Sequence, residues 1–138
     1  MAQTRVRAAT PTICVIEDDE GIREALRALL EDSGYHVIEA ANGLEGYRLL
    51  RESAGRLVAL VDHKMPQMDG CDLLELVAKD EDLRTRHEFI FVTASPRHAE
   101  EDCGETMEEL SATLLPKPFH IDEVLDAVSE AAGRMASE

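Results

Sequence analysis

The chain has 138 residues, of which 44% are hydrophobic and 31% charged, a balance typical of one compact globular domain. Its formal net charge of -15 disfavours direct binding to nucleic acid or to an anionic membrane, because both would repel it, and favours cations and basic protein surfaces as partners. No apolar run approaches the roughly 20 residues of a membrane-spanning helix, and the N-terminus lacks the apolar segment of a secretory signal. We therefore expect residues 1–10 to be a flexible N-terminal arm and residues 11–138 to be one domain.

The three cysteines are odd in number and widely separated, and none belongs to a C-x-x-C pair. They are Cys14, Cys71 and Cys103. This pattern argues against a disulfide framework and against a zinc site. A reducing cytoplasm is therefore the simplest compartment for the protein.

Short buried strands and amphipathic helices alternate along the first part of the sequence. A β-branched run over residues 12–16 stops at three acidic residues, which predicts a first buried strand. Apolar residues then recur with helical spacing up to Ser33-Gly34, which predicts a helix and its end. A second strand over residues 35–40 precedes the turn Asn42-Gly43 and a second helix.

The third strand is a run of five apolar residues, 57–61, too short for an ordinary helix and too apolar for a strand with one wet face. The run stops at Asp62, and the following Met65-Pro66 and Asp69-Gly70 prevent either regular element from continuing. Asp62 therefore lies at the carboxyl end of a central strand, which is the edge where open α/β sheets bind ligands. Taken alone, an Asp at such a position is an ordinary turn residue.

The second part of the sequence repeats the alternation. The predicted elements are a helix after residue 70, a polar segment over 80–86, a strand over 89–92, a helix over 96–110, a strand over 112–115 and a helix over 121–135. The helix over 96–110 has six acidic and few apolar residues, so we expect it to be marginal and mobile. Five strands alternating with five helices predict right-handed crossovers and a doubly wound parallel sheet.

Polar residues that suit phosphoryl transfer follow the strands at their shared edge. They are Glu17 and Asp18 after the first strand, Asp62 after the third, Thr93 after the fourth and Lys117 after the fifth. Ionised carboxylates crowded together repel by about 4 kcal/mol per pair at an effective dielectric near 20, so they need a cation, and oxygen ligands suit Mg²⁺. With that charge offset, an Asp carboxylate can attack a phosphoryl group while Lys and Thr donate to its oxygens. Neither a G-x-G-x-x-G nor a P-loop motif is present to support nucleotide binding.

Four segments at strand ends resemble the receiver domains of two-component response regulators, including those of the chemotaxis-regulator type. They are VIEDDEGIRE, VDHKMPQMDG, FVTAS and LLPKPF, in family order and at near-family spacing, and the resemblance covers residues 12–133. It implies a flavodoxin-like fold, a five-stranded parallel sheet in the order 2-1-3-4-5 with helices on both faces. Each segment alone is weakly specific, but the four together are specific.

The resemblance assigns a role to each residue at this edge. It implies that Asp62 is the phosphoacceptor and a ligand of Mg²⁺, with Asp18 as a direct ligand, Glu17 as a companion acid acting through water and Lys64 as a ligand through its backbone carbonyl. Thr93 and Lys117 would contact the phosphoryl group.

The resemblance also implies partners and a backbone feature. A cis Lys117-Pro118 bond is expected, and Ala94 would keep the approach to the phosphoacceptor open. The phosphodonor would be a phosphohistidine on a sensor histidine kinase or a histidine phosphotransfer protein, and a downstream protein target would read the signal. Such a domain is a signalling phosphoacceptor and not an enzyme, since it catalyses only its own phosphorylation and dephosphorylation.

Two departures from the family pattern bear on switching. Thr93 and Lys117 stand slightly farther apart than expected, which places an insertion in the helix over 96–110. Leu114 occupies a position where the family usually has Tyr or Phe. His63 follows Asp62 directly, but neighbouring strand-end side chains usually point apart, and we expect a structural place for it.

Two other functions remain as alternatives to the phosphorylated receiver. The first is an adaptor that uses the receiver fold to bind partners without phosphorylation or switching. The second is an independent phosphatase with an aspartyl intermediate, which the absence of a D-x-D signature at Asp62 disfavours.

Overall fold

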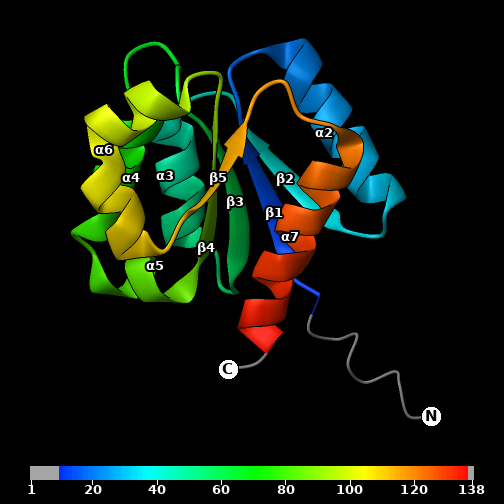
Figure 1. Cartoon of the computed structure of the whole chain (residues 1–138). Helices are drawn as coiled ribbons and strands as arrows, with labels where there is room; N and C mark the ends of the chain where they lie inside the picture. The colour runs from blue at the N-terminus through cyan, green and yellow to red at the C-terminus, as the bar shows by residue number, and fades with distance from the viewer. Residues whose placement is uncertain (1–9, 137–138) are drawn as a thin grey trace.

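The computed structural model describes residues 10–136, so the predicted N-terminal arm lies outside the described residues except for Thr10. The elements, labelled as in Figure 1, are β1 (Thr12–Ile16), α2 (Glu20–Asp32), β2 (His36–Ala40), α3 (Gly43–Glu52), β3 (Leu57–Asp62), α4 (Gly70–Ala78), α5 (Glu81–Arg86), β4 (Glu88–Thr93), α6 (Pro96–Leu110), β5 (Thr113–Pro116) and α7 (Ile121–Ala136). Within this range no helix combines the length and the apolar character needed to cross a membrane.

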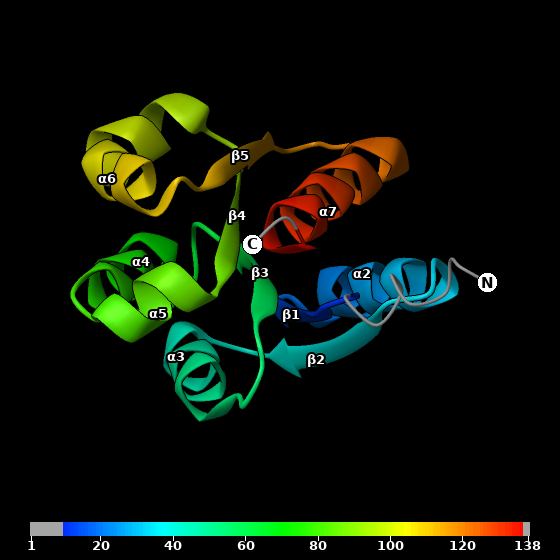
Figure 2. The same cartoon turned by 90° about the horizontal axis from the view of Figure 1, so that it is seen from below.

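The strands form one parallel sheet in the order β2-β1-β3-β4-β5, which confirms the predicted topology. Figure 2 shows the sheet between two groups of helices, with α3, α4, α5 and α6 on one side and α2 and α7 on the other. The central strand β3 is buried at all six positions, as expected for a strand covered on both faces.

Alternate residues of each strand supply the two halves of the core. In β1, Ile13 and Val15 pack with α2 and α7, whereas Cys14 and Ile16 pack with the helices on the opposite face. In β4, Phe89 and Phe91 face the α3–α6 side. The continuous apolar runs in the sequence therefore reflect a sheet with two dry faces.

Polar residues placed immediately before the helices set where five of them begin. Each accepts a hydrogen bond from a backbone N–H of the first turn, a group that has no partner within the helix. These capping residues are Asp19, Asn42, Asp69, Asp80 and Ser95.

The helix α5 is an additional element that the expected alternation of five strands with five helices did not include. Asp80 caps it and Leu83 is buried in the core, so the segment predicted only as polar forms a short helix of its own. The described residues therefore contain six helices. The single apolar residue was too weak a periodic signal to predict it.

The helix α6 forms where the sequence predicts it and packs beside α4, as Figure 2 shows. Its buried residues are Ala99, Cys103, Met107 and Leu110, which follow helical spacing on one face. Cys103 has non-helical backbone angles (φ -152°, ψ 36°), so two helical pieces meet at a kink there. The kink lies within the segment where the sequence places an insertion.

Candidate functional site

Three carboxylates meet at the carboxyl edge of the sheet, as predicted. The register pairs Ile16 of β1 with Val61 of β3, which brings Glu17 level with Asp62. Glu17, Asp18 and Asp62 each place one carboxylate oxygen within 4.8 Å of the other two. The order of the strands therefore assembles this acidic pocket from two separate segments of the chain.

Burial changes the acidity of two of the three acids. Glu17 is 4% exposed and Asp62 5% exposed, whereas Asp18 is exposed. Burial is the largest influence on Glu17 and raises its pKa from 4.5 to about 7, although the backbone N–H of Asp19 donates a hydrogen bond to its carboxylate. Burial likewise raises the pKa of Asp62, against the opposing effect of Lys117.

Lys117 is the cation of the pocket. Its Nζ donates to Oδ1 of Asp62 at 2.8 Å and lies 3.8 Å from Oε1 of Glu17. Burial alone would lower the pKa of Lys117, but the hydrogen bond and charge of Asp62 outweigh it, so the pKa is raised above 10.5. The Lys117-Pro118 peptide bond is cis, which confirms the expectation from the resemblance. Lys117 therefore enters the pocket as an ammonium ion.

The chemistry of the donors fits Mg²⁺. The pocket has a volume of about 270 Å³, and its lining includes the three acids, His63, Lys64, Ala94 and Lys117. Its ligands are carboxylate oxygens, which Mg²⁺ prefers, and it leaves room for the waters that this ion retains. The Lys64 ammonium lies 3.7 Å from Asp102, so its side chain extends toward α6 while the residue itself borders the pocket.

Thr93 is the predicted site residue that does not line the acidic pocket, although its neighbour Ala94 does. The Thr93 side chain is 1% exposed, and its hydroxyl shares a hydrogen bond of 2.9 Å with Nδ1 of His63. It also accepts a hydrogen bond of 3.0 Å from the backbone N–H of Ser95. The hydroxyl is therefore held on the side of the sheet that faces α6.

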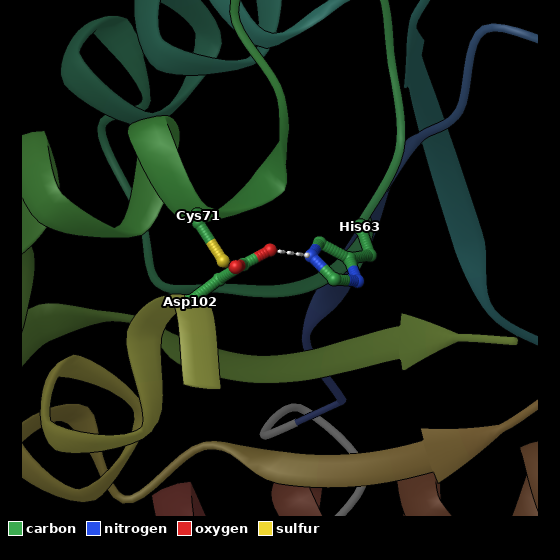
Figure 3. A group of neighbouring side chains, drawn as sticks. All are labelled: His63, Cys71 and Asp102. Atoms are coloured by element: carbon green, nitrogen blue, oxygen red, sulfur yellow. Dashed lines mark hydrogen bonds and ion pairs between the residues drawn. The ribbon is translucent and has the colours of Figure 1, made fainter. Parts of the chain in front are cut away.

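His63 connects the strand edge to α6. It is 1% exposed, packs against the ring of Phe91, and its Nε2 lies 3.1 Å from Oδ2 of Asp102. Figure 3 shows this contact, with the Cys71 side chain beside it. We expected a structural role for His63, which agrees with its burial. The sequence did not predict its contact with Asp102, because Asp102 lies 39 residues away and no local motif joins the two residues.

Cys71 and Cys103 form a disulfide between α4 and α6, which corrects the expectation from the cysteine pattern, since that pattern argued against a disulfide framework. Their Cα atoms are 5.6 Å apart, a normal spacing for such a bond. The two residues lie 32 positions apart on different helices, and only the packing of α6 on α4 brings them together. Among the described residues Cys14 is the one free cysteine, and it is buried.

Comparisons with known proteins agree with this geometry. The family model for the response regulator receiver domain matches residues 13–129. Sporulation initiation phosphotransferase F of Bacillus subtilis is 37% identical over 120 residues, which cover 86% of this chain and 90% of that protein.

Two solved structures share the fold. A CheY-like receiver domain protein from Methanospirillum hungatei has a TM-score of 0.78 at 25% identity, covering 94% of this chain and 99% of that one. The response regulator TrrA of Thermotoga maritima, solved in complex with Mg²⁺-BeF, has a TM-score of 0.70 at 25% identity, covering 88% and 98%. The chain therefore belongs to the family of response regulator receiver domains, the phosphoacceptor modules of two-component signalling.

Proposed function

We propose that Asp62 accepts a phosphoryl group from a phosphohistidine on a partner protein and that the phosphorylated domain then changes its α6–β5 face. The observation that supports this most directly is the position of Asp62, whose carboxylate lies in an acidic pocket with the Lys117 ammonium 2.8 Å away. An adaptor that only binds partners would have no use for this convergence of three acids and a lysine.

The transfer is a substitution at phosphorus. An Asp62 oxygen attacks the phosphoryl group in line, the bond from phosphorus to the imidazole nitrogen breaks, and the imidazole leaves with its electron pair. Lys117 then exchanges its hydrogen bond with Asp62 for one with a phosphoryl oxygen, where its charge offsets the charge that develops.

We propose that Asp18, Asp62 and the Lys64 backbone carbonyl hold Mg²⁺ directly and that Glu17 holds it through water. When bound, Mg²⁺ supplies positive charge that offsets the carboxylates and the phosphoryl oxygens together. The oxygen donors of this chain support the proposal, and so does the Mg²⁺-BeF complex of the Thermotoga maritima relative.

Thr93 supplies the proposed switch. For its hydroxyl to reach a phosphoryl oxygen on Asp62, it must give up the hydrogen bond with His63. His63 would then lose one of the contacts that join it to the strand edge, while it still faces Asp102 on α6. The chemistry at Asp62 would in this way change the packing of α6.

A groove beside the acidic pocket suits the phosphodonor. It has a volume of about 570 Å³, runs between α2 and the residues that follow β5, and includes apolar side chains such as Ile22, Leu29 and Phe119. Lys117 and Ala94 line both the groove and the pocket. We propose that it receives an apolar surface of the kinase or phosphotransfer protein that presents the phosphohistidine.

Phosphorylation by a small donor tests this function without requiring the partner. Wild-type protein incubated with acetyl phosphate and Mg²⁺ should gain the mass of one phosphoryl group, and Asp62→Asn should gain none. Asp69→Asn is the matched control, because Asn also caps a helix and Asp69 lies outside the pocket. Equal labelling of wild type and Asp62→Asn, or no labelling of the wild type, would remove the proposal.

A further inference from the structure

Four side chains of metal-binding type converge between the end of β3, α4 and α6, beside the acidic pocket, with which the cluster shares only His63. His63 Nε2, Cys71 Sγ and an Asp102 carboxylate oxygen lie within 4.8 Å of one another. Figure 3 shows the Asp102 carboxylate between the His63 ring and the Cys71 sulfur. Cys103 adds a second sulfur, since it is bonded to Cys71. This set of two sulfurs, one imidazole and one carboxylate serves no step of the proposed phosphoryl transfer.

We propose that reduction of the Cys71–Cys103 disulfide creates a binding site for Zn²⁺, with His63, Cys71, Asp102 and Cys103 as its four ligands. Two thiolates, an imidazole and a carboxylate are ligands that Zn²⁺ accepts in a tetrahedral arrangement, whereas Mg²⁺ does not favour sulfur. The proposal goes beyond phosphorylation and does not depend on it.

The geometry needs little adjustment. In a tetrahedral Zn²⁺ site the nitrogen and oxygen ligands are about 3.4 Å apart, and two thiolates are about 3.8 Å apart. His63 Nε2 and Asp102 Oδ2 are already 3.1 Å apart. The Cα atoms of the cysteines are 5.6 Å apart, so side-chain rotation within the reduced pair can separate the sulfurs by the required amount.

Burial and charge also suit a metal ion. His63, Cys71 and Cys103 are buried, whereas Asp102 is exposed and marks a route from solvent. Two thiolates and a carboxylate around Zn²⁺ leave one excess negative charge. The Lys64 ammonium, 3.7 Å from Asp102, lies where it offsets that charge.

The second ring nitrogen of His63, Nδ1, links the proposed metal site to Thr93. Nδ1 shares a hydrogen bond of 2.9 Å with the Thr93 hydroxyl. A metal on Nε2 requires that Nδ1 carry the proton, so Nδ1 becomes the donor and Thr93 the acceptor. If the proposed function holds, bound Zn²⁺ retains Thr93 beside His63 and opposes its movement toward a phosphoryl group.

The two sulfur ligands become available only when the Cys71–Cys103 disulfide is reduced. A dithiol reductant gives two electrons and two protons, its own sulfurs join in a disulfide, and the Cys71–Cys103 bond breaks to leave two thiols. Zn²⁺ binding then releases both thiol protons as the sulfurs become thiolates. In the oxidised protein only His63 and Asp102 remain as ligands, too few for a closed site.

Cobalt titration tests the site, because Co²⁺ bound by thiolates absorbs in the near ultraviolet and its tetrahedral complexes absorb in the visible. The protein is reduced with dithiothreitol, freed of reductant without oxygen, and titrated with Co²⁺. We expect one equivalent to give both signatures, Zn²⁺ to abolish them, excess Mg²⁺ to leave them unchanged, and the oxidised protein to give neither.

Matched variants identify the ligands, with thermal unfolding used to confirm that each variant is folded. Cys71→Ser and Cys103→Ser should each lose the signature of a two-thiolate site, and Asp102→Asn should bind Co²⁺ roughly tenfold or more weakly. Cys14→Ala and Glu100→Gln are the controls and should bind as the wild type does. Absence of thiolate bands in reduced wild type, their survival in both cysteine variants, or equal binding by the oxidised protein would overturn the proposal. None of these readouts involves phosphorylation.

Discussion

Replacing Glu17 with Gln should stabilise the metal-free protein at alkaline pH. The pKa of Glu17 is raised from 4.5 to about 7, chiefly by burial, so its charged form is disfavoured in the folded state. At about 1.4 kcal/mol per pKa unit, this increase in the pKa of Glu17 corresponds to a loss of about 3 kcal/mol of folding stability when the residue is charged. Solvent screening at the mouth of the pocket reduces the expected loss to about 1–2 kcal/mol. Gln removes the charge, and its carbonyl oxygen can still accept the hydrogen bond from Asp19.

The sign of the pH dependence follows from the raised pKa. Between pH 4.5 and about 7 the folded state binds more protons at Glu17 than the unfolded state does, so this residue's contribution to stability falls as pH rises. The gain from Glu17→Gln should therefore be nearly absent at pH 4.5, should grow through this window and should be complete by pH 8.

Urea unfolding in a chelating buffer measures the gain at both pH values. At pH 8 the unfolding midpoint of Glu17→Gln should rise with an unchanged slope. Glu24→Gln, at an exposed position of α2, is the control and should stay within about 0.5 kcal/mol of wild type. Saturation with Mg²⁺ at about 100 times its Kd should stabilise wild type by about 2.7 kcal/mol and stabilise Glu17→Gln by less. A variant that is less stable at pH 8, or gains equally at pH 4.5, would refute the reasoning.

Three further predictions concern residues around the pocket. Burial lowers the pKa of His87 to about 4, so the contribution of this residue to stability is present above pH 6.5 and is lost as pH falls toward 4. Urea unfolding should show that the wild type loses roughly 2 kcal/mol over this range and that His87→Gln does not show this loss; equal pH profiles of the two proteins would contradict it. Leu114→Ala should cost only about 1 kcal/mol and leave acetyl phosphate labelling intact, because the side chain is 38% exposed; lost labelling in a folded variant would contradict this. Gly70→Ala should cost about 1–3 kcal/mol in thermal unfolding, because its new Cβ would lie 2.4 Å from the Asp62 carbonyl oxygen and 2.7 Å from a ring carbon of Phe91. Gly55→Ala, with nothing within 4 Å of its new Cβ, should be tolerated, and equal effects of the two substitutions would contradict the prediction.

The sequence was most informative where hydrophobic patterning and strand ends coincide. The apolar run before Asp62 predicts a strand buried on both faces, and β3 is buried throughout. Since parallel strands end at one edge, the same pattern predicts that Glu17, Asp62 and Lys117 meet, and they do so within hydrogen-bonding or ion-pair distance. These inferences depend only on where each strand begins and ends, and the hydrophobic pattern of the sequence predicts those positions well.

Side-chain orientation and contacts between helices were beyond such reasoning. Thr93 lies at the end of its strand, as predicted, but its hydroxyl hydrogen-bonds to His63, whose ring turns toward α6. The Cys71–Cys103 pair depends on how α6 packs on α4, and no spacing of cysteines in the sequence reports that packing. Helix α5 was missed because only Leu83 anchors it.

Chemical mapping of the phosphorylated residue tests the central claim, that Asp62 is the phosphoacceptor. Borohydride reduces an aspartyl phosphate to homoserine, which peptide mass spectrometry can locate after treatment of the wild type with acetyl phosphate and Mg²⁺. We predict homoserine at position 62, with Asp18 unchanged although the two carboxylates lie in the same pocket. Homoserine at position 18, or at neither position in protein that has gained a phosphoryl group, would contradict the account.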